Sequence, residues 1–348
     1  MKILITGASG FVGGSIVEYL VKEYNFNEPL MIKCLVRKTS NLERVLAVIS
    51  EIERKSINNI EVKFSYGDIT EPQSLVEAVK EVDVVLHCAA LLRTNNVEDY
   101  YRVNHIGTKN LLEAVLLHNS KLKYFILVSS QAVSGPCCGN RPRLENEKSA
   151  PVSHYGKSKL LAEDEVMVYS KKFEGFGCKS IILRPGPVYG PYDKDMFLYF
   201  KYAQKGFLPV FSKEFVVQFT FIKDLSRVCK EIILSSSKIP SGVYFVAEER
   251  CYNITEISKI FSEVVSKNVK VVKLPYFFAY VYAYINEIVH KIFLHRAAVF
   301  NRDKLDELKC SYWLCRSSTI KNFLNIEYTP LKVAAIETYT WYKEKGWL

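Results

Sequence analysis

The stretch from Lys2 to Lys22, KILITGASGFVGGSIVEYLVK, decides the fold of this chain. Its aliphatic residues at Lys2–Thr6 predict a buried strand, and Ser15–Lys22 has the apolar spacing of a helix. Glycines at 7, 10 and 13 allow a tight turn and let the main chain approach a diphosphate at the helix N-terminus. This combination predicts a dinucleotide site, with a merely structural glycine turn as the alternative. The residues expected to bind the cofactor here are Gly7, Ser9, Gly10, Phe11, Val12 and Gly13.

Further short strands follow at a spacing that is typical of βαβ units. They are expected at Met31–Val36, Val62–Tyr66, Val82–His87, Tyr124–Ser129 and Ser180–Arg184, with helices between them. The pattern predicts an α/β fold with a doubly wound, parallel Rossmann sheet and a ligand crevice at the carboxyl ends of its strands. After Arg184 the chain becomes rich in proline and aromatic residues, and a strand is expected again at Gly242–Val246. We therefore expect a dinucleotide-binding domain of residues 1–185 and 218–247, interleaved with a smaller substrate-binding lobe of residues 186–217 and 248–348.

Composition limits the classes of partner. The 348 residues carry 47 Lys and Arg against 37 Asp and Glu, a formal net charge of +10, which suits a phosphate-bearing cofactor, an acidic membrane face or nucleic acid. The sequence has no basic stripe with a nucleic-acid-binding signature, so nucleic acid is not expected as a partner. The nine cysteines form no CxxC pair and no zinc-type spacing, so reduced thiols and no metal site are expected. The first residues are needed for the strand and turn rather than for a signal peptide, and we therefore expect a cytoplasmic protein.

The ends of the next strands carry the other expected cofactor contacts. Arg37 follows the second strand, where an NAD site usually has an acidic residue and an NADP site can use arginine for the 2′-phosphate. We therefore expect NADP as the cofactor, with NAD as the alternative. Asp68, after the third strand, is expected either to accept from the adenine amine or to cap the following helix. Ile69, Ala89 and Ala90 are expected to contact the cofactor at the same edge.

Tyr155 and Lys159 lie four residues apart in the segment YGKSK, at the start of an expected helix. Residues at this spacing share a helix face, so the phenol and the ammonium project into the same volume. A neighbouring ammonium together with an oxidised nicotinamide favours the phenolate and is expected to lower the phenol pKa toward a range useful for general acid–base catalysis. Ser130, at the end of the fifth strand, is expected to orient a substrate carbonyl or alcohol, with Ser129 as the alternative.

The motifs GASGFVG, GDIT, HCAA, VSSQAVSG, YGKSK and RPGPVYGP occur in this order, and together they resemble the extended short-chain dehydrogenase/reductase family over nearly the whole chain. The resemblance implies that Ser130, Tyr155 and Lys159 form the catalytic triad, with Tyr155 as proton donor and acceptor and Lys159 also as a ligand of the ribose. It implies that Asn104 lies on the helix behind the site and that the segment from Pro185 to Val188 borders the nicotinamide. It also offers a homodimer as one alternative for the assembly.

Two departures from the family pattern narrow the expected substrate. Gln131-Ala132 follows Ser130 where family dehydratases have Asp-Glu, and Gln218 stands where nucleotide-sugar epimerases often have an arginine for the diphosphate. We therefore expect an NAD(P)-dependent dehydrogenase or reductase that acts on a secondary alcohol or ketone of a mostly apolar small molecule. A nucleotide-sugar epimerase and a non-catalytic cofactor-binding regulator are the alternatives.

The stretch Tyr276–Leu294, YFFAYVYAYINEIVHKIFL, is expected to form an aromatic and aliphatic helix. The charge in its middle argues against a membrane span. We expect the aromatic part to pack in the core of the second lobe, with contact to a membrane surface as the less favoured alternative.

Overall fold

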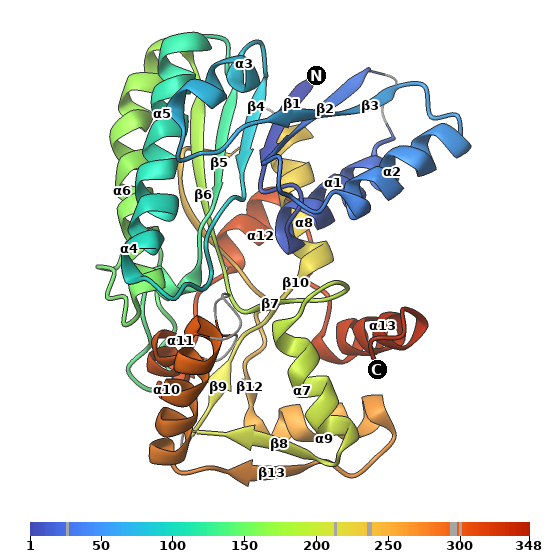
Figure 1. Ribbon diagram of the computed structural model, residues 1–348, viewed down its shortest axis with the longest axis vertical. Helices are drawn as coiled ribbons and strands as arrows, with labels where there is room; N and C mark the ends of the chain where they lie inside the picture. Colours follow the sequence, from blue (N-terminus) through green and yellow to red (C-terminus); the bar gives the residue numbers. More distant parts are fainter. Residues whose placement is uncertain (26–27, 212–213, 235–238, 293–297, 299–300) are drawn as a thin grey trace.

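A computed structural model of the chain describes residues 1–25, 28–211, 214–234, 239–292, 298 and 301–348. Seven parallel strands form its main sheet in the order β11-β6-β5-β4-β1-β2-β3 (Figure 1). Their bounds are β1 Lys2–Thr6, β2 Leu30–Val36, β3 Ile60–Tyr66, β4 Val84–His87, β5 Tyr124–Val128, β6 Lys179–Pro185 and β11 Gly242–Val246. The predicted α/β class and parallel Rossmann sheet are confirmed, and each strand lies within three residues of its expected bounds at either end.

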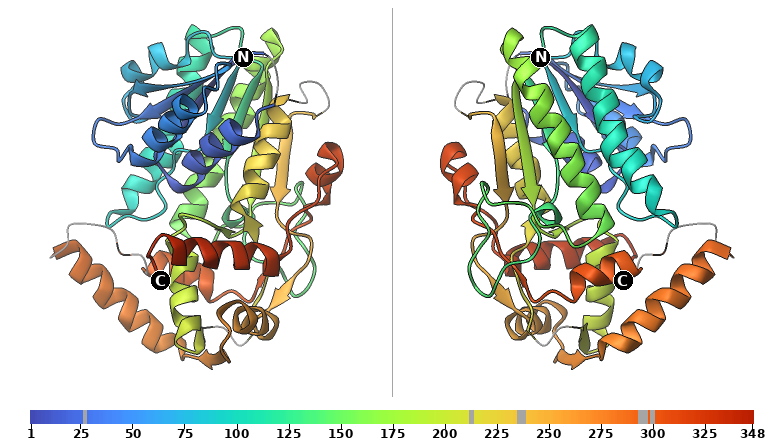
Figure 2. Two further views of the ribbon diagram at one scale, coloured as in Figure 1. Left: turned by 90° about the vertical axis from the view of Figure 1, so that its right-hand side faces the viewer. Right: turned by 90° about the vertical axis from the view of Figure 1, so that its left-hand side faces the viewer.

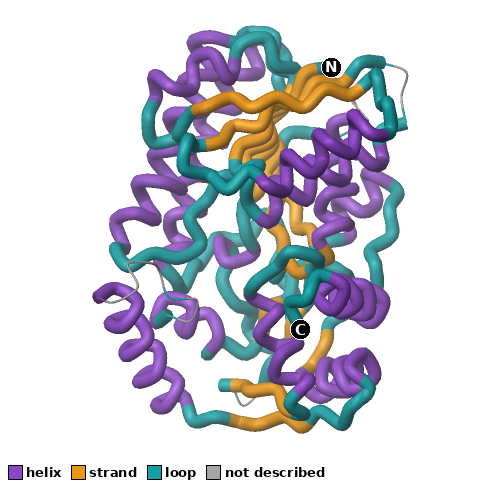
Figure 3. The backbone as a smooth tube through the Cα atoms, turned by 45° about the vertical axis from the view of Figure 1, so that its right-hand side comes forward, coloured by secondary structure: helices purple, strands orange, loops and turns teal. Residues whose placement is uncertain are grey.

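Both faces of the sheet are covered by helices, because alternate side chains of a strand point to opposite faces. Figure 3 shows helices on both sides of the sheet. On β1, Ile3 and Ile5 pack into a core shared with α1 and α8, whereas Leu4 packs into a second core beneath α5 and α6. The helices of this part are α1 Phe11–Glu23, α2 Glu43–Arg54, α3 Val76–Val79, α4 Val97–Tyr100, α5 Gly107–His118, α6 His154–Phe173 and α8 Ile222–Leu234.

The second lobe lies beyond the carboxyl ends of the sheet strands, and it is built from chain segments that alternate with the sheet (Figure 1). Its short strands pair as β10-β7, β12-β9-β14 and β13-β8. The strands are β7 Val188–Tyr189, β8 Phe207–Val210, β9 Val216–Val217, β10 Thr220–Phe221, β12 Tyr252–Asn253, β13 Lys270–Lys273 and β14 Tyr312–Trp313. The helices are α7 Asp195–Gln204, α9 Ile254–Val265, α10 Tyr276–Ile292, α11 Arg302–Leu308, α12 Ser318–Leu324 and α13 Leu331–Glu344. Of these, α12 contacts β11 and α8 on the sheet side, although it lies within the expected range 248–348 of the second lobe.

The expected helix at Tyr276–Leu294 forms as α10, but the expectation that it packs in the core is wrong. Phe277 and Phe278 are 69% and 65% exposed, and α10 stands at the outer side of the second lobe (Figure 2). Among the α10 side chains that the structure describes, residues 276–290, only the small residues Ala279 and Ala283 are buried, in a cluster with Leu305. Among the helices of the described residues, none is long and apolar enough to cross a membrane. Residues 293–297, which include the expected end of this helix, lie outside the described residues.

Candidate active site

The glycine turn between β1 and α1 has the close packing that its sequence predicts. Gly7 has a φ of 68°, a left-handed conformation that suits glycine, and its carbonyl accepts from Gly10 N at 2.9 Å. A Cβ on Gly13 would lie 2.4 Å from the Gly7 carbonyl oxygen, so helix and turn can meet only without a side chain at this position. Gly10 caps α1 without a side-chain hydrogen bond, so the N–H groups of the first turn stay available to an anion.

The part of the cavity that is expected to take the adenosine lies at the carboxyl ends of β2 and β3. Arg37 is exposed and lines the cavity just beyond Val36, and its backbone N–H donates to Ser40 Oγ. The Asp68 carboxylate accepts from both the backbone N–H and the hydroxyl of Thr70, each at 2.8 Å. Asp68 therefore holds the turn after β3 while it lines the same cavity.

One cavity of about 1220 Å³ runs from the glycine turn into the second lobe. It brings together most of the residues expected from the sequence. Those that line it are Gly7, Ser9, Gly10, Phe11, Val12, Gly13, Arg37, Asp68, Ile69, Ala89, Ala90, Ser130, Tyr155, Pro185 and Val188. Lys159 and Asn104 lie behind this surface instead.

Ser130 and Ser129 have different environments. The Ser130 hydroxyl lines the cavity and hydrogen-bonds the Tyr155 phenol. The Ser129 hydroxyl is buried and donates to Glu163, which also forms a buried ion pair with Arg184 at 2.6 Å. Because the Ser129 hydroxyl is held by this network, the arrangement favours Ser130 as the residue that contacts a substrate oxygen.

Lys159 and Asn104 lie behind the cavity surface and contact the segments that line it. The Lys159 ammonium is fully buried and donates to the Val128 carbonyl at 2.9 Å, and burial lowers its pKa to about 8. Asn104 lies in a helical turn, Tyr101–Ile106, that precedes α5. Its amide donates to Ser158 Oγ and accepts from Leu91 N, which ties the loop after β4 to helix α6.

The Tyr155 phenol has a raised pKa in this structure. Burial, together with the charge of Glu307, raises the pKa of the phenol to about 12, although the Ser130 hydrogen bond and the Lys304 ammonium act in the opposite direction. The ammonium of Lys159 is directed to the Val128 carbonyl, and the expected lowering of the phenol pKa by Lys159 together with an oxidised nicotinamide stays a prediction. In the chain without ligand, Tyr155 is protonated over the whole neutral range.

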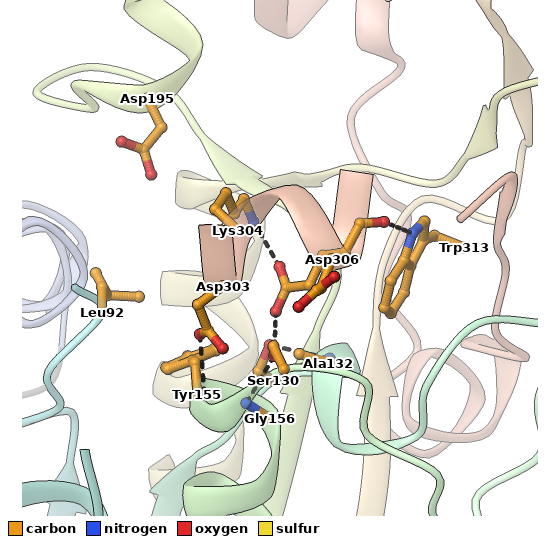
Figure 4. A network of polar contacts seen from close by, with 12 residues as sticks. Leu92, Ser130, Ala132, Tyr155, Gly156, Asp195, Asp303, Lys304, Asp306 and Trp313 are labelled. Carbon is orange, nitrogen blue, oxygen red and sulfur yellow. Dashed lines mark hydrogen bonds and ion pairs between the residues drawn. The ribbon is translucent and has the colours of Figure 1, made fainter. Parts of the chain in front are cut away.

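Helix α11 supplies charged residues that the sequence analysis missed. The Asp303 carboxylate accepts from the backbone N–H groups of His154 at 2.6 Å and Tyr155 at 3.2 Å, so it caps the helix that carries Tyr155 (Figure 4). Glu307 accepts from Ser153 Oγ and forms an ion pair with Lys304, both at 2.7 Å. Asp303 and Lys304 lie above Tyr155 in Figure 4. The only sequence signal was the charged string RDKLDE, which resembles any exposed helix.

Two glutamines near the site differ in their hydrogen bonding. The Gln131 amide is buried against the cavity, and neither of its polar atoms has a hydrogen-bond partner among the described residues. Gln218 is satisfied: its amide donates to the carbonyls of Glu248 and Glu249 and accepts from Cys315 N at 2.6 Å. Gln131 is therefore free to bond a ligand, whereas Gln218 holds the second lobe together.

The second-lobe end of the cavity is mostly apolar. Its walls come from β8, β9, α9 and β14 and from the residues that follow β8 and β9, and they include Leu208, Phe211, Phe219, Phe261 and Trp313. Contacts also cross the cavity between the two parts of the molecule. The Arg44 guanidinium lies 3.7 Å from the centre of the Tyr192 ring, and Arg93 forms an ion pair with Asp195.

The residues present fit a nicotinamide dinucleotide. The glycine turn leaves no room for side chains where a diphosphate would approach, and the uncapped start of α1 offers N–H donors to it. At the other end of the cavity, Tyr155, Ser130 and the Pro185–Val188 segment surround the space that a nicotinamide and a substrate carbonyl would share.

Comparisons with known proteins agree with this geometry. A family model described as the NAD dependent epimerase/dehydratase family matches residues 3–247. A ceramide reductase of Caulobacter vibrioides is 25% identical over 99% of this chain and 96% of its own length. The human sterol-4-alpha-carboxylate 3-dehydrogenase, decarboxylating, is 28% identical over 64% of this chain and 55% of its own length, so this match spans about half of that relative. The structure of a UDP-glucuronic acid 4-epimerase from Bacillus cereus with UDP-glucuronic acid and NAD shares the fold, with a TM-score of 0.71 and 23% identity over 99% of this chain and all of that one.

Proposed function

Because the chain belongs to the NAD-dependent epimerase/dehydratase family, we propose that it is an oxidoreductase of the extended short-chain type that transfers hydride between NADP and a secondary alcohol or ketone. Family membership confirms the expectation of an NAD-dependent enzyme, and the reaction, substrate and NADP preference are our proposal. The observation that carries it is the cavity that joins the glycine turn, the Ser130–Tyr155 pair and an apolar second-lobe end.

The chain's residues have separate tasks in this reaction. In the reducing direction the Tyr155 hydroxyl donates its proton to the carbonyl oxygen, and Ser130 donates a hydrogen bond to the same oxygen. The nicotinamide, when bound, supplies the hydride and, in its oxidised form, adds positive charge that lowers the phenol pKa. Lys159 supports this site from behind, and the walls of the cavity exclude water from the reacting atoms.

An apolar substrate is supported by the composition of the second-lobe walls. A cavity lined by aromatic and aliphatic side chains gains affinity by burying apolar surface, and a small number of polar groups set the orientation. The unpartnered amide of Gln131 is suited to bond one polar group of such a ligand. Two relatives are named for a ceramide and for a sterol carboxylate, both of which are largely apolar molecules.

The preference for NADP rests on Arg37. This residue lines the cavity at the end of β2, whereas the equally exposed Lys38 does not line it. Replacing Arg37 by Asp is expected to weaken NADP binding by about 10- to 100-fold, since a charge-assisted contact to the 2′-phosphate is lost and a repulsive charge is added. Lys38→Asp is the matched control and is expected to have a much smaller effect. Equal losses in the two variants, or an unchanged preference in Arg37→Asp, would contradict the assignment.

Nucleotide-sugar epimerisation is the second candidate, since several relatives carry that name, including a UDP-glucose 4-epimerase of Vibrio cholerae. The position of Gln218 argues against it, because this side chain is fully bonded within the protein and does not line the cavity. The test follows nicotinamide absorbance and product stereochemistry with apolar ketones and with sugar nucleotides. We expect cofactor consumption in step with ketone reduction. An inverted sugar without net cofactor turnover would overturn the proposal, and no turnover with any substrate class would favour a cofactor-binding regulator.

A further inference from the structure

Helix α10 exposes an unusual surface. All nine exposed positions between Phe277 and Val289 carry aromatic or aliphatic side chains, with Phe277 at 69% and Tyr282 at 60% exposure. At about 100° per residue, these nine positions span an arc of roughly 200° around the helix axis. Between Phe277 and Val289 no charged residue of the helix falls within this arc, and the Arg302 guanidinium lies against it, 5.2 Å from the centre of the Tyr284 ring. We call this surface the α10 face.

Three polar residues of α10 lie on the opposite side, toward the protein. Asn286, Glu287 and His290 are partly buried on the side that also carries the buried residues Ala279 and Ala283. Glu287 accepts from the backbone and the side chain of Arg302, at 2.6 and 2.8 Å. A surface helix of a globular protein normally has the reverse arrangement, with its apolar stripe toward the core. The pattern therefore indicates that the α10 face, which the described residues leave exposed, meets an apolar environment.

The width of the α10 face and the types of its side chains indicate which kind of partner covers it. A partner helix or a second copy of the chain covers a narrow stripe, whereas a lipid interface surrounds a partly immersed helix on more than one side. Tyrosine is enriched where a side chain needs an apolar body and a wet end, as at the level of lipid headgroups. Four of the residues from Tyr276 to Tyr284 are tyrosines.

The charge around the helix fits an anionic surface. Residues 267–309 contain eight Lys and Arg against four Asp and Glu. All four acidic groups are bonded within the protein: Glu287 to Arg302, Asp303 to the start of α6, Asp306 to Lys309 and Glu307 to Lys304. Lys270 and Lys273 on β13 are exposed immediately before the helix. Each basic residue near a membrane of anionic lipid adds to its attraction.

We propose that the α10 face docks the protein on the surface of an anionic phospholipid membrane, with the helix lying in the plane of the interface. Tyr276 and Phe211 pack against the buried cluster under α10, and Phe211 also lines the cavity. Docking through α10 therefore brings the apolar end of the cavity close to lipid. This suits the apolar substrate of the proposed function, but docking itself does not depend on that function.

The test measures sedimentation of the full chain with vesicles of phosphatidylcholine alone and of equal parts phosphatidylcholine and phosphatidylglycerol. We expect binding to the mixed vesicles and a loss of at least about tenfold in the triple variant Phe277→Ser/Tyr282→Ser/Ile285→Ser, because its apolar contact with lipid is removed. The matched control replaces three exposed apolar residues of the sheet part, Leu117→Ser/Met167→Ser/Val168→Ser, and is expected to bind vesicles like the wild type.

Further measurements distinguish docking on a membrane from dimer formation through the α10 face. Lys270→Glu/Lys273→Glu is expected to reduce the preference for the anionic vesicles. Absence of vesicle binding, or equal binding by the two triple variants, would overturn the proposal. A concentration-dependent dimer that only the α10 variant loses would also overturn it and would identify a second copy as the occupant. Cofactor affinity and turnover of a water-soluble ketone are measured in parallel, so that a failure of the proposed reaction is distinguished from a failure of docking.

Discussion

Replacing Asp303 by Asn tests whether α11 holds the catalytic helix in position. The carboxylate accepts from His154 N at 2.6 Å and Tyr155 N at 3.2 Å, and it places a negative charge at the N-terminus of α6. An asparagine side chain has the same shape as aspartate and keeps one acceptor oxygen. Its NH₂ group replaces the second oxygen, and this donor would face the second backbone N–H. The lost charged hydrogen bond is worth about 1.5–3 kcal/mol, which corresponds to roughly 10- to 100-fold faster exchange of these two amide hydrogens.

Hydrogen exchange followed by mass spectrometry or NMR measures this change directly. The increase is expected in the first turn of α6, and the rate of reduction is expected to fall while cofactor affinity stays unchanged, since Tyr155 loses its fixed position. Asp306→Asn is the matched control, because Asp306 lies on the same helix and pairs only with Lys309. If Asp303→Asn exchanges like Asp306→Asn at the start of α6, the reasoning is refuted.

Three further predictions concern the dinucleotide-binding part. Gly13→Ala is expected to weaken cofactor binding by at least about tenfold in a titration, because its Cβ would meet a carbonyl oxygen at 2.4 Å, whereas Gly175→Ala has open space around its Cβ and should bind normally. Burial lowers the pKa of His87 to about 3. The folded protein therefore loses stability as the pH falls below the pKa of a histidine in the unfolded chain, near ~6.5. His87→Asn should make the free energy of unfolding less dependent on pH in this range, and an equally steep dependence would contradict a buried neutral imidazole. Glu163→Gln leaves the buried Arg184 cation without its partner and should cost about 3–5 kcal/mol in denaturant unfolding, and a cost under about 1 kcal/mol would count against this pairing.

The sheet and the glycine turn could be predicted from sequence because local patterns determine them. Buried parallel strands have continuous apolar runs, and Gly13 is required by its contact with the nearby carbonyl of Gly7, although Gly7 itself also approaches the distant backbone of Ala89. The strand β1 was expected at Lys2–Thr6 and is found there. The sequence also predicted that Ser130 lies close to Tyr155, since both residues lie at the carboxyl edge of one sheet.

The contribution of α11 could not be predicted, because it depends on contacts between residues about 150 positions apart, such as the bond from His154 N to Asp303. The α10 helix was assigned to the core for a related reason. Its apolar composition is that of a buried helix, and only the tertiary structure shows that Ala279 and Ala283, rather than the aromatic residues, face the protein. The bond from the Lys159 ammonium to the Val128 carbonyl could not be predicted either, because it joins residues about 30 positions apart.

The most direct measurement is single-turnover reduction of an apolar ketone by Tyr155→Phe, compared with the wild type under saturating cofactor. Hydride transfer is expected to slow by about 10²- to 10⁴-fold while cofactor affinity is retained, since only the proton donor is removed. An unchanged rate of hydride transfer in Tyr155→Phe would contradict the role given to this phenol.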